Sequence, residues 1–153
     1  ALMQAKADLN WTSGHMVTTG PLTDERYLDL PNRAADGTIG FCHFPDPASS
    51  SEPGFVKYRK AMAKYNPTCP FDRYSLYGYV YGQLIVKGIR EAGQNLTRER
   101  LVDALENLGS WDAQGPIPPV TLTKINHHAQ SSGFICELKD GRFEDLSGWI
   151  KAE

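Results

Sequence analysis

The sequence has no long hydrophobic run, no excess of one charge and few cysteines, and each absence narrows what the protein can be. No apolar stretch in the 153 residues approaches the roughly 20 that are needed to cross a bilayer. Acidic residues number 18 against 16 lysines and arginines, which gives a formal net charge of −2. Nucleic-acid-binding domains usually carry a basic surface that neutralises phosphates, so this balance argues against nucleic acid as the main partner.

The three cysteines, Cys42, Cys69 and Cys136, are too few and too widely spaced to form a disulfide scaffold. One pair could join in an oxidising compartment and leave one thiol over. Alternatively, all three could be buried as small hydrophobic side chains. The sequence alone leaves both states open.

The motifs of familiar catalytic and cofactor sites are also missing. There is no Gly-x-Ser-x-Gly nucleophile elbow, and the glycines of "GTIG" and "GYVYG" lack the spacing of a dinucleotide-binding loop. Two pairs of residues invite a metal site: Cys42 with His43, and His127 with His128. Adjacent histidines on a strand point to opposite faces, and no Cys-x-x-Cys or His-x-x-x-His spacing supports such a site. We therefore predict no enzyme activity, no cofactor and no metal.

The sequence does contain the composition of a globular domain, with 41% hydrophobic and 22% charged residues. Helical spacing and capping residues predict helices at the start of the chain and over 23–31, 55–65, 75–92 and 97–108. Strands are predicted within 11–22, after the turn at 36–37 and from residue 111 onward, closing with a hairpin about 140–141. Helices that alternate with strands in this way predict an α/β fold.

Four tyrosines stand within eight positions at the front of the longest predicted helix: Tyr74, Tyr77, Tyr79 and Tyr81. In a helix Tyr74, Tyr77 and Tyr81 share one face, whereas Tyr79 points elsewhere and is predicted to pack in the core. Tyr74 and Tyr77, with Ser75 between them, stand where free amide groups favour a polar or anionic partner. The alternative is that all four rings pack and their hydroxyls reach water.

Four segments, taken in order, carry a family resemblance: "RAADGTIGFCHFPDP" (33–47), "EPGFVKYRKAMAKYNP" (52–67), "SLYGYVYGQLIVKGIREAGQNLTRERLVDALENLGSWDAQGPI" (75–117) and "SGFICELKDGRF" (132–143). Together they resemble the C-terminal half of the periplasmic binding proteins of the leucine/isoleucine/valine-binding type, the substrate receptors of branched-chain amino-acid ABC transporters. The order of the segments carries the resemblance, and it covers nearly the whole chain.

The resemblance implies an α/β fold, the C-terminal half of a two-lobe, Rossmann-like type I periplasmic binding protein. It assigns residues 1–44 to the second lobe, 45–122 to the first lobe, and 123–153, with the terminal hairpin, back to the second lobe. Crossing segments near 44–47 and 118–120 would let the two lobes close on a ligand.

About half of such a receptor would lie outside these 153 residues. The chain also opens on "ALMQAKADLNW", which looks like a helix already under way without an initiator Met or a cap. We therefore expect a fragment of a longer protein, in which a signal sequence could precede this part. We also expect its strand edges and apolar helix faces to favour self-association.

The same resemblance identifies a candidate ligand site in the cleft between the lobes. In the family the front of the long helix forms an aromatic or apolar wall, and Tyr74, Ser75, Leu76 and Tyr77 occupy that place here. Rigid rings with hydroxyl groups suit it because they bury a large area and can still orient a ligand. The other two tyrosines are left for packing.

On the second lobe the family offers a glutamate to the ligand's α-ammonium group. The comparable stretch here, "TSGHMVTTGP", has His15, Met16 and Val17 and no carboxylate before Asp24. Because a desolvated ammonium needs a charge or good acceptors, we expect a small organic acid or an aromatic compound ahead of an amino acid such as leucine or valine. The alternative is that the loop is displaced and that Asp24 or Glu25 supplies the carboxylate.

The predicted function is therefore solute capture for an ABC transporter permease, in the periplasm or outside the cell. The alternative is a sensory or regulatory domain of the same fold that signals to a partner protein, since fold alone does not separate the two.

Overall fold

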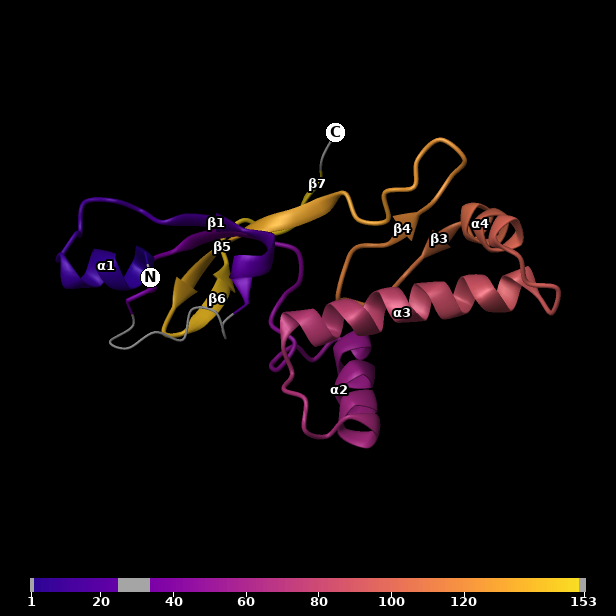
Figure 1. The fold of residues 1–153 in the computed structure, drawn as a ribbon, viewed down its shortest axis with the longest axis horizontal. Coiled ribbons are helices and arrows are strands. Elements are labelled where there is room, and N and C mark those ends of the chain that lie inside the picture. Colours follow the sequence, from indigo (N-terminus) through magenta and orange to yellow (C-terminus); the bar gives the residue numbers. More distant parts are fainter. Residues whose placement is uncertain (1, 25–33, 152–153) are drawn as a thin grey trace. The chain divides into compact units, whose positions relative to one another are not determined.

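The computed structural model describes residues 2–24 and 34–151, and the chain divides into two compact units (Figure 1). Unit 1 consists of Ala1–Asp46 and Ser132–Glu153, and unit 2 of Pro47–Ser131. Unit 2 is thus inserted between the two segments of unit 1. The chain passes between the units at 46–47 and again at 131–132, and the crossing segments near 44–47 and 118–120 stay predictions. The assignment of the units to receptor lobes stays a prediction.

Unit 1 is built around one mixed sheet. Its strands are hydrogen-bonded in the order β1-β2-β5-β6, and β7 pairs with β5. β1 runs parallel to β2, whereas the pairs that β5 makes with β2, β6 and β7 are antiparallel. The elements of this unit are α1 (Leu2–Asp8), β1 (Val17–Thr19), the 3-10 helix η1 (Gly20–Thr23), β2 (Ile39–Cys42), β5 (Ser132–Lys139), β6 (Arg142–Asp145) and β7 (Ile150–Lys151).

Local chemistry explains the turns of this sheet. Asp140 and Gly141, between β5 and β6, have φ angles of 51° and 76°, and positive φ at both positions is what a two-residue hairpin requires. The predicted hairpin is therefore confirmed. The strand predicted after Gly37 is present as β2, with four residues. The helix predicted over 23–31 lies, from residue 25 on, outside the described residues.

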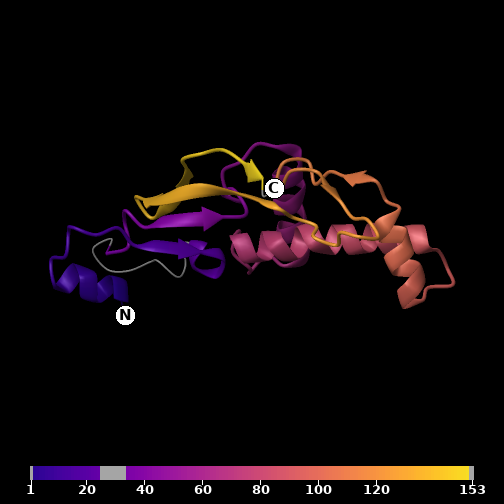
Figure 2. The ribbon, with the colours of Figure 1, turned by 90° about the horizontal axis from the view of Figure 1, so that it is seen from above.

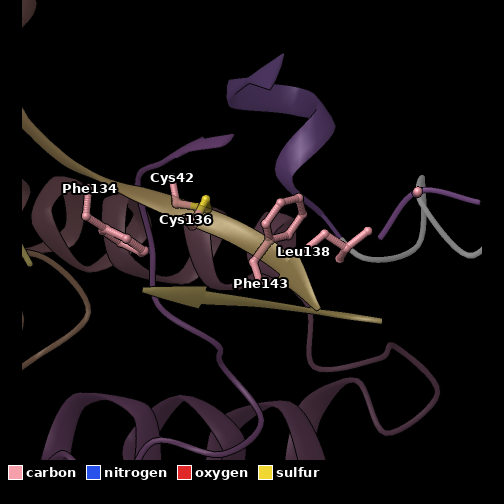
Figure 3. Close-up of a cluster of buried hydrophobic side chains, with 6 residues drawn as sticks. Cys42, Phe134, Cys136, Leu138 and Phe143 are labelled. Atoms are coloured by element: carbon pink, nitrogen blue, oxygen red, sulfur yellow. A yellow bond between two sulfur atoms is a disulfide. The ribbon is translucent and has the colours of Figure 1, made fainter. Parts of the chain in front are cut away.

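The core of unit 1 lies where β2 and β5 pair, and a disulfide joins Cys42 to Cys136 there (Figure 3). Both cysteines are fully buried. Gly40 lies opposite Cys136, and a Cβ at Gly40 would stand 3.0 Å from the Cys136 Sγ, so a larger residue would crowd the sulfur. Cys69 remains a free thiol, which settles the choice between the two cysteine states. The buried residues that form this hydrophobic core are Ala35, Cys42, Phe134, Cys136, Leu138 and Phe143.

Unit 2 is mainly helical, and its helices begin within two residues of the predicted starts. α3 starts after the capping residue Asp72 and ends before Gly93, whose φ is 76°. α4 starts after Thr97, whose hydroxyl accepts a hydrogen bond from the Arg100 amide at 3.2 Å. α4 packs against the C-terminal half of α3 (Figure 2). The elements of unit 2 are α2 (Pro53–Tyr65), α3 (Arg73–Ala92), α4 (Arg98–Glu106), β3 (Ser110–Trp111) and β4 (Val120–Thr121).

None of the helices within residues 2–24 and 34–151 combines the length and the apolar character that crossing a membrane requires.

Replacing both Cys42 and Cys136 with serine should lower the free energy of unfolding by about 2 to 5 kcal/mol. The disulfide closes a loop between residues 94 positions apart, and a long loop gains much freedom in the unfolded chain when the link is removed. Urea titration of the oxidised protein measures the difference, and Cys69→Ser is the matched control that should change little. Titration of three free thiols in the unfolded, unreduced protein would contradict this account.

Candidate functional site

The first turn of α3 is held by a capping box. The Asp72 carboxylate accepts a hydrogen bond from the Ser75 amide at 2.8 Å, and the Asp72 amide donates to the Ser75 Oγ at 3.3 Å. Asp72 and Arg73 are both buried. One of the amides that could receive an anionic ligand at this helix end is therefore already used inside the protein.

The hydroxyl of Ser75 is also engaged inside unit 2. It lies 2.5 Å from the hydroxyl of Tyr58, a fully buried residue of α2, and 3.1 Å from the carbonyl oxygens of Pro70 and Asp72. Burial raises the pKa of Tyr58, and the hydrogen bond with Ser75 partly opposes this shift. The ring of Tyr79 packs edge-on against Tyr58 at 5.5 Å, and burial raises the pKa of Tyr79 as well. The structure thus gives Ser75 a role in joining α2 to α3.

The other residues predicted to form a wall of the ligand site differ in how much of their surface is exposed. Leu76 is fully buried, whereas Tyr74 and Tyr77 are 40% and 44% exposed. The Tyr77 ring lies 4.8 Å from the ring of Tyr81, whose hydroxyl donates to the Gln130 Oε1 at 2.8 Å. Burial, with Tyr77 nearby, raises the pKa of Tyr81. Tyr74 and Tyr77 therefore present ring surface to solvent, and their contact with a ligand stays a prediction.

In unit 1 the parallel pair β1 and β2 defines a second candidate position. Ligands of open α/β sheets bind outside the carboxyl ends of the parallel strands. β1 ends at Thr19 and is followed by Gly20, and β2 ends at Cys42 and is followed by His43. Because Thr19 pairs with Phe41, these two strand ends lie at the same edge of the sheet. His43 is half-buried there and packs edge-on against Phe41 at 5.2 Å.

The residues predicted for this unit lie at the other end of β1. His15 and Met16 precede the strand, and Val17 is its first residue with 77% of its surface exposed. The Met16 carbonyl accepts a hydrogen bond from the Ile39 amide at 2.8 Å, which continues the pairing with β2. The sequence did not indicate Thr19 and His43 as candidates, because the residues of a three-residue strand do not reveal its direction or its pairing partner.

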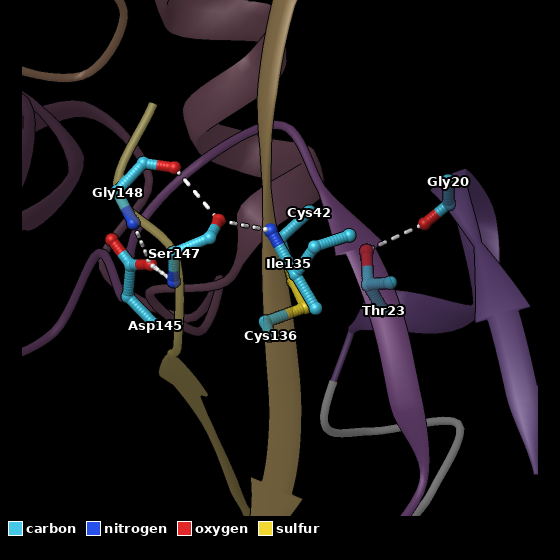
Figure 4. Close-up of a disulfide and its surroundings, with 8 residues drawn as sticks. All are labelled: Gly20, Thr23, Cys42, Ile135, Cys136, Asp145, Ser147 and Gly148. Carbon is cyan, nitrogen blue, oxygen red and sulfur yellow. Dashed lines mark hydrogen bonds between the residues drawn. A yellow bond between two sulfur atoms is a disulfide. The ribbon is translucent and has the colours of Figure 1, made fainter. Parts of the chain in front are cut away.

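Asp24 follows η1, on the carboxyl side of β1, and is buried with 1% of its surface exposed. The preceding Thr23 is also buried and its hydroxyl donates to the Gly20 carbonyl at 2.7 Å (Figure 4). Glu25, the other alternative acceptor for an ammonium group, lies outside the described residues. Of these two acidic residues, the structure therefore describes Asp24 alone, as a buried carboxyl group that follows η1.

Two of the four residues that could suggest a metal site, Cys42 and His127, have other partners. Cys42 is joined to Cys136, and the His127 Nε2 lies 2.8 Å from the Glu106 Oε1. Across the two described ranges, no group of three or more His, Cys, Asp or Glu side chains is placed to hold a metal ion.

The sequence profile of the periplasmic binding protein family matches residues 1–142. The chain belongs to this family. The predicted resemblance and the α/β fold class are thereby confirmed, since solved structures of the same kind superpose on it closely. The family and these neighbours are binding proteins and not enzymes.

Three solved structures illustrate the likeness of this periplasmic binding protein to its relatives. A possible leucine/isoleucine/valine-binding protein from Rhodopirellula baltica SH 1 has 25% identity and a TM-score of 0.80, over 95% of this chain and 39% of the other. A branched-chain amino-acid ABC transporter protein from Thermus thermophilus with bound valine has 17% identity and a TM-score of 0.80, over 99% and 42%. A fatty acid ABC transporter substrate-binding protein from Thermomonospora curvata has 19% identity and a TM-score of 0.81, over 99% and 40%.

The chain thus covers only 39% to 42% of the length of these solved chains. A search of curated protein sequences found no match.

Unit 2 should lose stability as the pH rises above 10, and Tyr81→Phe should reduce this loss. The pKa of Tyr81 in the folded protein lies above its ordinary value of 10.0, so the neutral phenol favours the folded state. Its contribution is complete below pH 10 and disappears as the pH rises through the folded pKa. Urea titrations between pH 8 and 11.5 measure the slope, with Tyr65→Phe at an exposed tyrosine as control. Equal slopes in the two variants would contradict the assignment.

Proposed function

We propose that this chain is part of a solute-binding receptor that captures a small organic ligand for an ABC transporter permease. The family match over residues 1–142 carries this proposal. It is supported by neighbours described as ABC transporter substrate-binding proteins, one of which holds valine and another of which is described for fatty acids. Such a receptor does no chemistry on its ligand. Its affinity comes from non-covalent contacts and from a shift toward the ligand-bound conformation.

The proposed location is the periplasm or the cell exterior. The family acts there, and the buried disulfide Cys42–Cys136 suits an oxidising compartment.

Each unit has its own candidate residues for ligand contact. In unit 2 the exposed rings of Tyr74 and Tyr77 would cover an apolar or aromatic body. In unit 1 the candidates are Thr19 and His43 at the carboxyl ends of the parallel strands, in addition to His15, Met16 and Val17 near the start of β1. Hydroxyl groups and an imidazole can donate hydrogen bonds to a carboxylate, so a small organic acid or aromatic acid fits these groups.

An amino-acid ligand would place a different demand on the site. Its ammonium group would need an acceptor, and Asp24, which follows η1, is buried. Because a carboxyl group with 1% of its surface exposed offers little to a ligand's ammonium, we expect the receptor to prefer a ligand without a free α-amino group over leucine or valine.

Thermal shift measurements on the full-length receptor distinguish these ligand classes. Benzoate and small dicarboxylates should raise the melting temperature more than leucine, isoleucine or valine do. Strong stabilisation by the amino acids, lost in Asp24→Asn but kept in Asp36→Asn, a half-buried turn residue that serves as the control, would reverse the preference. Conversion of any bound compound into a product would overturn the receptor function itself.

Tyr74→Ala and Tyr77→Ala should each weaken binding of the best ligand about tenfold, which corresponds to about 1.4 kcal/mol. The reason is that each change removes a ring that would lie against the ligand. Isothermal titration calorimetry measures the affinity, and Tyr65→Ala, which removes a ring 76% exposed on α2, is the matched control. Unchanged affinity in both tyrosine variants would remove this wall from the site.

A further inference from the structure

The helix α3 contains three glycines that its own stability does not favour. A glycine in a helix interior costs about 1 kcal/mol relative to alanine, so each position calls for a reason. Packing explains Gly88, where a Cβ would stand 2.6 Å from the Leu105 Cδ2 and 3.1 Å from the Leu101 Cδ1 of α4. At Gly78 and Gly82 a Cβ would meet nothing within 4 Å.

The two unexplained glycines lie in a groove of about 580 Å³ beside β3. Gly78, Gly82, Val86 and Arg90 follow one another at intervals of four residues, so they form a single row along the helix. The row has no side chain at its first two positions, which lets another backbone approach closely. The groove is lined by Gly78, Tyr79, Gly82, Gln83, Val86, Lys87, Arg90 and Trp111.

The surface around this groove is apolar for an exposed helix. Ile85, Val86 and Ile89 are 44%, 46% and 39% exposed, although the opposite face of α3 is already buried through Leu76 and Leu84. A helix that is apolar on both a covered and an uncovered face is typical of the interior of a larger domain. The groove therefore has the character of a packing surface.

We propose that this groove receives a helix from the part of the receptor that lies outside these 153 residues. The chain spans 39% to 42% of the solved family members, so more than half of a family member's length is available to supply that helix. Side-chain ridges of one helix pack into the grooves of another, and a row without side chains at Gly78 and Gly82 accepts such a ridge at short distance. Arg90 at the far end suits the negative C-terminal end of the incoming helix, whereas Lys87 is already paired with Glu91.

This assignment depends on family membership and not on the ligand, so it can fail or hold separately from the proposed function. A second copy of this chain is the competing occupant of the groove.

The test compares the same substitutions in the 153-residue chain and in the full-length receptor. In the chain, Gly78→Ala and Gly82→Ala should each raise the ratio of folded to unfolded protein about fivefold, because alanine favours the helix and meets open space. In the full-length receptor the same changes should lower that ratio, because the incoming helix occupies the space. Gly88→Ala is the matched control and should lower the ratio in both proteins, since Leu105 fills that position in each.

Stabilisation by Gly78→Ala and Gly82→Ala in both proteins would show an open groove and overturn the proposal. Destabilisation already in the 153-residue chain, together with a molecular mass that rises with concentration, would assign the groove to a second copy and also overturn it.

Thiol labelling provides an independent measurement if a variant folds poorly. Gly82→Cys in a Cys69→Ser background should react with a maleimide at least tenfold more slowly in the full-length receptor than in the 153-residue chain. Equal labelling rates would show that nothing covers the position.

Discussion

The pairing of β2 with β5 is the contact on which the architecture of this protein depends. These strands lie far apart in the sequence, and the disulfide between Cys42 and Cys136 joins them across 94 positions. The pairing brings both segments of unit 1 into one sheet and buries Phe134 and Leu138 around the sulfurs. It also requires the chain to leave unit 1 and return to it on neighbouring strands, with the whole of unit 2 inserted between them. A cross-link at this point therefore stabilises the topology as well as the core.

In unit 2 the central element is α3, and different parts of this helix make different contacts. Its first turn is closed by the Asp72–Ser75 capping box and tied to α2 through the Tyr58 hydroxyl. Its C-terminal half receives α4 at Gly88. The two exposed tyrosines are held at fixed positions by these contacts, because a turn that is capped and anchored cannot fray. Rigidity of this kind lowers the entropy that a ligand contact would cost.

Much of the local structure could be predicted because it depends on neighbours in the sequence. The helix start at Thr97, the helix end at Gly93 and the hairpin at 140–141 all follow from capping and turn chemistry within a few residues, whereas the predicted start of α3 at residue 75 is two residues late. Helical periodicity also separated Tyr79 from the face shared by the other three tyrosines. For the candidate site, the contact of the Ser75 hydroxyl with Tyr58 could not be read in this way, since it depends on α2, which the chain places beyond a connecting loop.

The sequence by itself determined the fold class, the helices and the family resemblance, because these rest on composition, short-range spacing and the order of segments. The tertiary structure decided which cysteines pair, at which edge of the sheet the candidate residues lie, and which glycines meet a neighbour. Cys69 is left as a free thiol because the fold brings Cys42 and Cys136 together. Thr19 lies at the same edge of the sheet as His43 because β1 pairs in parallel with β2. Each of these outcomes depends on contacts between residues distant in the chain, and no local propensity encodes such contacts.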